Sequence, residues 1–335
     1  MRLKQLIKAS SGRLSLTPPL KQGLFGNTGS ILMLHRVVPD ETAAALPHRE
    51  PLCVGKSSFE NLLLWLKQHF DCVPLAELFA LNGTSDRRPR VALTFDDGWR
   101  DNAVHAFPLL RQHQVPASIF LSTDFIGSAR RFWWEAIGET LWGSFGAEAR
   151  ERLAATLRQL QLAPPAELAA EQPDEQRSKA LAGFLQRLKR LPADQLQALA
   201  DGCPEPAAPH ALDWQQVAEM EASGLVRFGP HGASHAILTE LDESSLEAEV
   251  QRSRETLDRH CAAPLPIYCY PNGDHDAHVH AALRRQGYRL ALSTRPGLVR
   301  NRPTEDLALP RIGVSHQSAR QPGLLAWRLL QGVRQ

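Results

Sequence analysis

Residues 91–98 read Val-Ala-Leu-Thr-Phe-Asp-Asp-Gly, an apolar run that ends in two adjacent carboxylates and a glycine. Val, Thr and Phe favour a buried pleated surface, so we expect a strand over residues 91–95. Asp96, Asp97 and Gly98 then lie where the strand opens into a loop, which is the strand end at which α/β folds gather functional groups. At such an end both carboxylates can face one cleft, although Asp-Asp-Gly is also an ordinary turn sequence.

Strand and helix patterns alternate around this stretch. A helical pattern over residues 102–113 follows the two aspartates, and a loop is expected over residues 40–56. Further strands are expected at residues 30–35, 117–121, 225–228, 265–270, 288–292 and 309–314. The alternation predicts an α/β fold with parallel strands and right-handed connections.

Size and composition narrow the class of protein. A chain of 335 residues can form one large barrel-like domain or two ordinary domains. The hydrophobic fraction of 43% is typical of a globular protein, and a net charge of +2 gives no electrostatic case for a nucleic-acid partner. The five cysteines are scattered and form no Cys-x-x-Cys pair, which argues against a disulfide framework and indicates a reducing compartment.

The composition changes between residues 131 and 210. Ala, Leu, Gln, Glu and Arg dominate there with helical spacing, so we predict a helical insertion within a barrel that spans residues 30–315. Trp133 and Trp134 open the insertion; they are expected to anchor a core or an interface, with stacking on sugar rings as the alternative. Residues 316–335 are expected to form a C-terminal helix.

The N-terminal segment, residues 1–29, is basic and weakly amphipathic. Leu3, Leu6 and Ile7 alternate with Lys4 and Lys8. We expect this apolar stripe to dock on the protein's own core, with docking on a membrane surface as the alternative. The segment carries no signal-peptide pattern, and no run is apolar enough to span a bilayer. We therefore expect a cytoplasmic protein, with the inner membrane surface as the alternative location.

Two further predicted strands are followed by histidines. His231 and His235 are four residues apart in Gly-Pro-His-Gly-Ala-Ser-His. If a helical turn starts at His231, both imidazoles point the same way and can chelate one metal ion. One carboxylate added to such a pair gives a three-ligand site with an open position for water. His35 ends the predicted strand at residues 30–35, where a buried core histidine is the alternative interpretation.

Several stretches together resemble the polysaccharide deacetylases, the NodB-homology group or carbohydrate esterase family 4. TFDDG at residues 94–98 and HGASH at residues 231–235 resemble the first two signature motifs of that family. YCYPNG at 268–273 and LPRIGV at 309–314 are looser matches. ILMLHRV at 31–37 is similar to the opening of the circularly permuted branch that includes poly-N-acetylglucosamine deacetylases. The resemblance covers residues 30–130 and 210–315, and the helical insertion lies outside it.

The resemblance implies a distorted (β/α)7-type barrel and a metal-dependent removal of acetyl groups from an N-acetylated sugar. It assigns Asp97, His231 and His235 to a divalent metal, most plausibly Zn²⁺, with Co²⁺ or Ni²⁺ as substitutes. It assigns Asp96 as general base and His35 as the general acid that protonates the leaving amine. The implied partner is a glycan, either a polysaccharide or a lipid-linked precursor, and the oligomeric state is left open.

The third motif departs from the family pattern. The resemblance places the backbone N–H of Asn272, after Pro271, at the oxyanion of the reaction. The family usually has an arginine that orients the base where Cys269 stands, and a tyrosine where Asn272 stands. Arg311, on the last predicted strand, is the candidate to supply the missing charge, and we group it with Pro271 and Asn272 around the substrate.

Two other functions are compatible with the residues. The same barrel can hydrolyse a non-sugar amide or a cyclic imide, because a fold does not fix the substrate. The other hypothesis is a non-catalytic glycan-binding module. The presence of Asp96, Asp97, His231 and His235 in the first two motifs argues against it.

Overall fold

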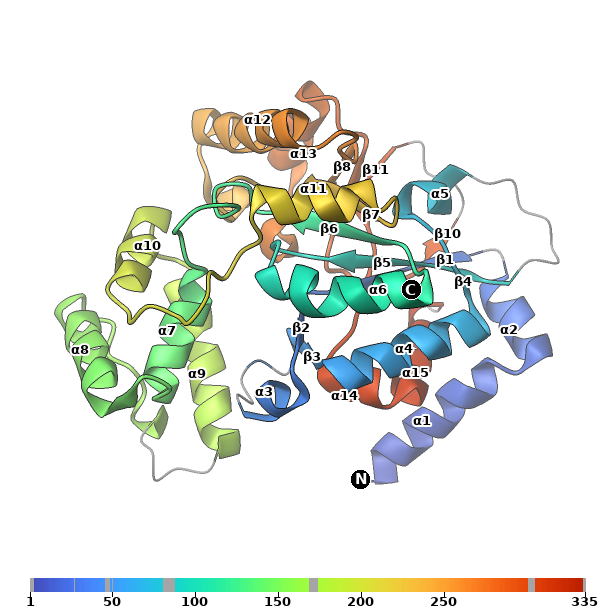
Figure 1. Cartoon of the computed structure of the whole chain (residues 1–335), viewed down its shortest axis with the longest axis horizontal. Coiled ribbons are helices and arrows are strands. Elements are labelled where there is room, and N and C mark those ends of the chain that lie inside the picture. The colour runs from blue at the N-terminus through green and yellow to red at the C-terminus, as the bar shows by residue number, and fades with distance from the viewer. Residues whose placement is uncertain are drawn as a thin grey trace.

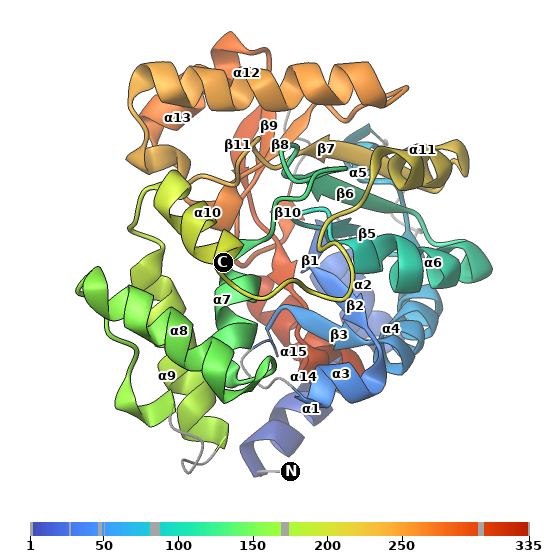
Figure 2. The same cartoon turned by 60° about the vertical axis from the view of Figure 1, so that its left-hand side comes forward.

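The computed structural model describes residues 3–333 except 27, 46–48, 50, 81–87, 169–173 and 301–304. Strands occupy the centre of the molecule and helices surround them, with one group of helices set to the side (Figure 1). The N-terminal helices lie beside the C-terminal ones (Figure 2).

The central sheet has seven strands in the order β10-β1-β5-β6-β7, with β12 paired to β1 and β4 paired to β5. All of these pairs are parallel except that of β1 with β10. The strands are β1 (Thr28–Leu34), β4 (Asp71–Cys72), β5 (Arg90–Phe95), β6 (Ala117–Leu121), β7 (Val226–Pro230), β10 (Val299–Arg300) and β12 (Ile312–Gly313). Their central residues are buried, as the near-continuous apolar runs of parallel strands require.

A second parallel sheet continues the curve beyond β7. It consists of β8 (Ile267–Cys269), β9 (Leu290–Leu292) and β11 (Asp306–Leu309). The backbone N–H of Leu265 donates to the carbonyl of Phe228 at 2.7 Å and joins the two sheets. Two short strands, β2 (Arg36–Val38) and β3 (Cys53–Gly55), pair separately. The α/β class and the distorted barrel of parallel strands are thus confirmed.

Amphipathic helices cover the outside of the strands. They are α4 (Lys56–His69), α5 (Leu75–Ala80), α6 (Phe107–His113) with the π-helical turn η2 (Asn102–Ala106) before it, α11 (Trp214–Ala222), the 3-10 turn η4 (Leu238–Glu240), α12 (Glu243–His260) and α13 (Ala277–Arg285). Asp213 caps α11: its side chain accepts from the N–H of Gln216, whose side-chain oxygen accepts in turn from the N–H of Asp213.

Three local predictions are wrong. Residues 40–56 contain the helix α3 (Asp40–Ala45) and strand β3 rather than one loop. The single strand expected at residues 309–314 is divided between β11 and β12, because Pro310 lacks the N–H that a continuous ladder needs. The C-terminal helix is two helices, α14 (His316–Arg320) and α15 (Pro322–Gly332), since the residue before Pro322 is forced out of helical conformation.

The insertion forms four helices with a small core of their own. The helices are α7 (Trp133–Trp142), α8 (Gly146–Gln159), α9 (Asp174–Leu188) and α10 (Ala193–Asp201), with the 3-10 turn η3 (Ala166–Leu168) between α8 and α9. Leu157, Leu181 and Phe184 are buried in a hydrophobic cluster separate from that of the barrel. Arg131 closes the base of the insertion by donating to the carbonyls of Cys203 and Pro204 at 2.9 and 2.7 Å.

The N-terminal segment folds as α1 (Leu3–Ser15) and α2 (Pro18–Phe25). The expectation that its apolar stripe docks on the core is wrong, because α1 packs on α15 through Ala9, Gly12 and Ser15 instead. Small residues let the two helix backbones approach closely, so Leu3 and Ile7 are left at the surface. In the described part of the chain, no helix is both long and apolar enough to cross a bilayer.

Candidate functional site

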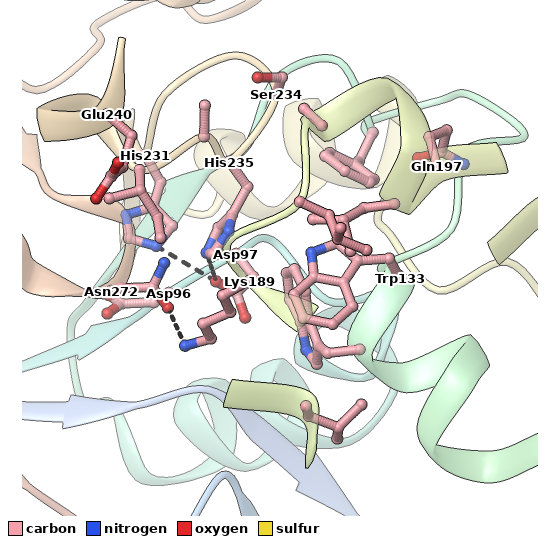
Figure 3. Close-up of a pocket in the computed structure, with 18 of the residues that line it drawn as sticks. Asp96, Asp97, Trp133, Lys189, Gln197, His231, Ser234, His235, Glu240 and Asn272 are labelled. Atoms are coloured by element: carbon pink, nitrogen blue, oxygen red, sulfur yellow. Dashed lines mark hydrogen bonds and ion pairs between the residues drawn. The ribbon is translucent and has the colours of Figure 1, made fainter. Parts of the chain in front are cut away.

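The carboxyl ends of three parallel strands of the central sheet bring the predicted site residues together. Asp96 and Asp97 follow β5, His231 follows β7 and His35 follows β1. All four side chains line a cavity of about 1320 Å³ that lies between the barrel and the insertion (Figure 3). The strand-end argument made from the sequence therefore holds for these residues.

Asp97, His231 and His235 present their donor atoms to one point. The Oδ1 atom of Asp97 lies 3.3 Å from the Nε2 atoms of both histidines. The Nδ1 atom of His231 lies 2.9 Å from the carbonyl of Cys269, so it carries the proton and leaves the lone pair on Nε2. Trp99 donates from Nε1 to the other oxygen of Asp97 at 2.8 Å, which leaves Oδ1 for a ligand role. A two-histidine, one-carboxylate donor set of this kind fits a divalent cation such as zinc.

The two histidines do not lie on a helical turn. Residues 231–235 form a loop in which Gly232 has φ of +74° and His235 has φ of +60°. The loop is held by Glu249 of α12, whose Oε1 accepts from the N–H groups of Ala233 and Ser234 at 2.8 and 2.6 Å. The imidazoles converge because this buried carboxylate fixes the turn.

Backbone strain is concentrated at the site. Among the described residues, five that are not glycine have positive φ, and three of them are Asp97, His235 and Asn272. Left-handed backbone at such residues costs about 1–3 kcal/mol and persists where the surrounding contacts impose it. Asp97 and His235 thus reach their positions through conformations that a free chain would avoid.

Arg311, the residue before β12, holds Asp96 in place. Its Nη1 and Nη2 atoms donate to Oδ1 and Oδ2 of Asp96 at 2.7 and 2.8 Å, and its Nε atom donates to the carbonyl of Ser293. Burial alone would raise the pKa of Asp96, but the Arg311 guanidinium and the nearby His231 lower it below its ordinary value. Asp96 is therefore ionised and has oxygen lone pairs left to accept a proton.

The contact between Arg311 and Asp96 compensates for the arginine that is missing from the third motif. Cys269 stands where the family usually has arginine, and its Sγ lies 3.5 Å from Oδ1 of Asp96. Arg311 supplies the charge instead, as the sequence suggested. Its side chain is fully buried and does not line the cavity, so its grouping with the substrate residues is wrong: it contacts Asp96 instead.

Asp96, His231 and Cys269 form a second group of converging donor atoms. That group is the weaker cation site for two reasons. Both oxygens of Asp96 already accept from a guanidinium whose positive charge repels a cation. Burial also raises the pKa of the Cys269 thiol, which keeps it protonated.

The remaining predicted residues lie around the same cavity. His35 lines it, and its carbonyl accepts from the side-chain amide of Asn102 at 2.9 Å. Pro271 and Asn272 form the turn η5 (Pro271–Gly273), in which Asn272 has φ of +57°. The Asn272 side chain lines the cavity, and Pro271 is buried beneath it.

The insertion supplies the opposite wall of the cavity. Lys189, just after α9, donates from Nζ to Oδ1 of Asn272 at 2.5 Å, and Trp133 of α7 lines the wall nearby (Figure 3). Burial lowers the pKa of Lys189, while Asp274 and Asp97 act in the opposite direction. The ring of Trp134 lies 4.6 Å from that of His235.

Sequence reasoning missed Lys189, Trp99 and Glu249. Lys189 is one of many basic residues in the insertion, and no local pattern marks it. Trp99 lies two residues after Asp97, so its place beside that carboxylate could have been inferred. Glu249 lies on the buried face of α12, where an acidic residue is a signal of a polar contact.

Comparisons with known proteins agree with this geometry. The family profile described as polysaccharide deacetylase matches residues 83–291, more than half of the chain. The chain therefore belongs to the polysaccharide deacetylase family, whose members are metal-dependent hydrolases of acetylated glycans.

The individual relatives match either a short stretch of the chain or most of it at low sequence identity. YxkH of Bacillus subtilis (strain 168), a protein named for the polysaccharide deacetylases, is 34% identical over 79 residues, which are 23% of this chain and 28% of YxkH. The structure of IcaB from Ammonifex degensii matches with a TM-score of 0.55 and 18% identity over 90% of this chain and 98% of IcaB. PplD, a Streptococcus pyogenes deacetylase solved with acetate, matches with a TM-score of 0.56 and 18% identity over 89% of this chain and 96% of PplD.

Proposed function

We propose that this protein removes an acetyl group from an N-acetylated sugar of a polysaccharide or a lipid-linked glycan precursor. The observation that carries the proposal is the convergence of Asp97, His231 and His235 beside an ionised Asp96 at one end of a large cavity. Family membership supports the same reaction class.

The proposal assigns Asp97, His231 and His235 to a divalent cation, with zinc as the first choice and cobalt or nickel as substitutes. When bound, such a cation lowers the pKa of a coordinated water and polarises the acetyl carbonyl. Trp99 and the carbonyl of Cys269 hold two of the ligands in orientation for this role.

The proposal assigns Asp96 to take the proton of the attacking water. Arg311 keeps the carboxylate charged and fixes its plane, so the carboxylate accepts the proton without having to reorient. The proposal assigns His35, which follows β1 and lines the cavity, to return a proton to the leaving sugar nitrogen.

The proposal assigns two groups to stabilise the oxygen on which negative charge develops. The backbone N–H of Asn272 is the first candidate, as the family resemblance implies. The Lys189 ammonium is the second, because it is the cation that the insertion brings to Asn272, and charge at a developing oxyanion lowers the barrier most directly.

The test is acetate release from a panel of N-acetylhexosamine oligosaccharides, free and lipid-linked, with zinc-loaded protein. We expect turnover of at least one substrate, and loss of turnover in both Asp96→Asn and Asp97→Ala. Full activity of Asp96→Asn would remove its role as base. Turnover of a non-sugar amide or cyclic imide alone would replace the glycan with that substrate class, and binding without turnover would indicate a glycan-binding module.

A further inference from the structure

Helix α1 (Leu3–Ser15) displays an apolar stripe at its surface, interrupted by Ser10. Leu3, Leu6, Ile7 and Leu14 are 72%, 45%, 57% and 61% exposed. With 3.6 residues per turn, residues 3, 7 and 14 fall on one face of the helix, and residue 6 lies beside them. Leu20 of α2, 44% exposed, adds a fifth apolar side chain within the same segment. The other large exposed apolar side chains of the described chain, Leu64, Val104 and Leu160, lie on separate elements.

The stripe cannot turn inward while α1 stays on α15. A Cβ atom placed on Gly12 would lie 2.2 Å from the carbonyl oxygen of Gly323, and one placed on Gly323 would lie 2.7 Å from that of Ala9. The two helices therefore meet backbone to backbone, and only small residues fit at the crossing. Rotating α1 to bury its leucines would drive large side chains into this contact. The contact between α1 and α15 thus keeps the apolar stripe at the surface of the protein.

Positive charge borders the stripe. Lys4 and Lys8 lie along one side of it and Arg13 along the other, and all three are exposed. The sequence contains no acidic residue before Asp40, so the segment carries no negative charge of its own. An apolar face bordered by lysine and arginine is complementary to a bilayer surface that contains anionic lipid.

We propose that the α1 stripe binds the surface of a membrane that carries anionic lipids, with Leu3, Ile7 and Leu14 inserted among the acyl chains. Lys4, Lys8 and Arg13 then pair with the lipid headgroups. The helix lies in the plane of the surface and does not cross it, which agrees with its length of 13 residues. This inference does not depend on the proposed hydrolase activity, because the stripe is separate from the residues that line the cavity.

Vesicle flotation tests the proposal. Full-length protein is mixed with vesicles of phosphatidylcholine alone or with phosphatidylglycerol added, and the floated fraction is measured. We expect binding to the anionic vesicles and about tenfold weaker binding to phosphatidylcholine alone. The triple variant Leu3→Ser/Ile7→Ser/Leu14→Ser should lose binding by at least about tenfold, because three buried apolar side chains are removed from the lipid.

A matched control and two further readouts keep the test decisive. Leu160→Ser, which removes an exposed leucine from the insertion, should bind like the wild type. Lys4→Glu/Lys8→Glu should lose the preference for anionic vesicles. The thermal midpoint of each variant should be unchanged, because the replaced side chains are exposed. Wild-type protein that fails to float, or a triple variant that floats equally well, would overturn the proposal. So would a wild-type dimer that the triple variant converts to a monomer, since a second copy would then cover the stripe.

Discussion

The two walls of the cavity are built in different ways. On the barrel wall, Asp96 and His231 are each 2% exposed and are held by contacts from other strands, among them Arg311, which does not itself line the cavity. On the insertion wall, Lys189 is half-buried and reaches the site through one hydrogen bond to Asn272. From this contrast we expect the barrel wall to hold the reacting groups in position. We expect the insertion wall to contribute mainly to substrate binding.

The insertion wall is nevertheless anchored. Glu135 of α7 forms ion pairs with Arg36 of β2 and with Arg49, and Arg49 also pairs with Glu139 at 2.6 Å. Glu135 and Arg49 are buried, so removing either of them would leave the other's charge uncompensated. The insertion therefore acts as a fixed side of the cavity, and variants of its lining residues report on substrate contacts.

The largest effect is expected from Asp96→Asn. The amide keeps the shape of the side chain but cannot accept the proton of water, so kcat should fall by about 10²–10⁴-fold. Zinc content should stay at the wild-type level, because Asp96 is not among the proposed ligands. Steady-state acetate release together with metal analysis measures both quantities, and a kcat within about twofold of wild type would contradict the assignment.

The next effect is expected from Arg311→Met. Loss of the guanidinium leaves Asp96 buried without its partner, which should lower the free energy of unfolding by about 3 kcal/mol. In the wild type the lowered pKa of Asp96 adds stability above the unfolded pKa, and that stability disappears as the pH falls through the folded value. In the variant, burial instead raises the pKa of Asp96.

The acid limb of the kcat/KM profile of Arg311→Met should therefore move to higher pH, by about one unit or more. Arg311→Lys is the control, since it keeps the charge but loses the paired contact, and its limb should move less. An unchanged limb in Arg311→Met would show that Arg311 does not set the charge state of the base.

A smaller effect is expected on the insertion wall from Lys189→Met. Removing the ammonium should lower kcat by about tenfold with zinc content unchanged, because one favourable charge is lost beside the developing oxyanion. Lys189→Arg should recover part of the activity. Lys179→Met, at an exposed lysine within α9 that does not line the cavity, is the matched control. If Lys189→Met and Lys179→Met have the same kcat, the Lys189 ammonium does not contribute to the reaction.

The smallest effect is expected from Trp133→Ala. The indole lines the cavity without contacting the proposed metal ligands, so its loss should raise KM by about three- to tenfold and leave kcat nearly unchanged. A drop in kcat without a change in KM would contradict this prediction. It would show that Trp133 affects the chemical step, as the residues of the barrel wall are expected to do.

The parts of the site that follow strand ends were predictable from the sequence. Asp96, Asp97, His231 and His35 are brought together by the order of the parallel strands, which the alternation of strand and helix patterns already indicates. Arg311 could be named as a replacement charge, but its paired contact with Asp96 depends on how β12 is placed beside β1. The sequence alone did not determine that placement.

The contacts between distant segments were not predictable. Lys189 meets Asn272 across 83 positions of the chain, with no motif that links them. The orientation of α1 was predicted wrongly because apolar periodicity was taken to mark the buried face. The buried face consists of Ala9, Gly12 and Ser15, whose small size gives little hydrophobic signal but permits the close helix contact.

The most direct test of the account is the zinc content of Asp97→Ala, compared with wild type and Asp96→Asn after equilibrium dialysis. If Asp97, His231 and His235 hold one cation, wild type and Asp96→Asn should each bind about one ion per chain, and Asp97→Ala should bind zinc at least about tenfold more weakly. Circular dichroism should show all three proteins folded. Wild-type zinc affinity in folded Asp97→Ala would contradict the account.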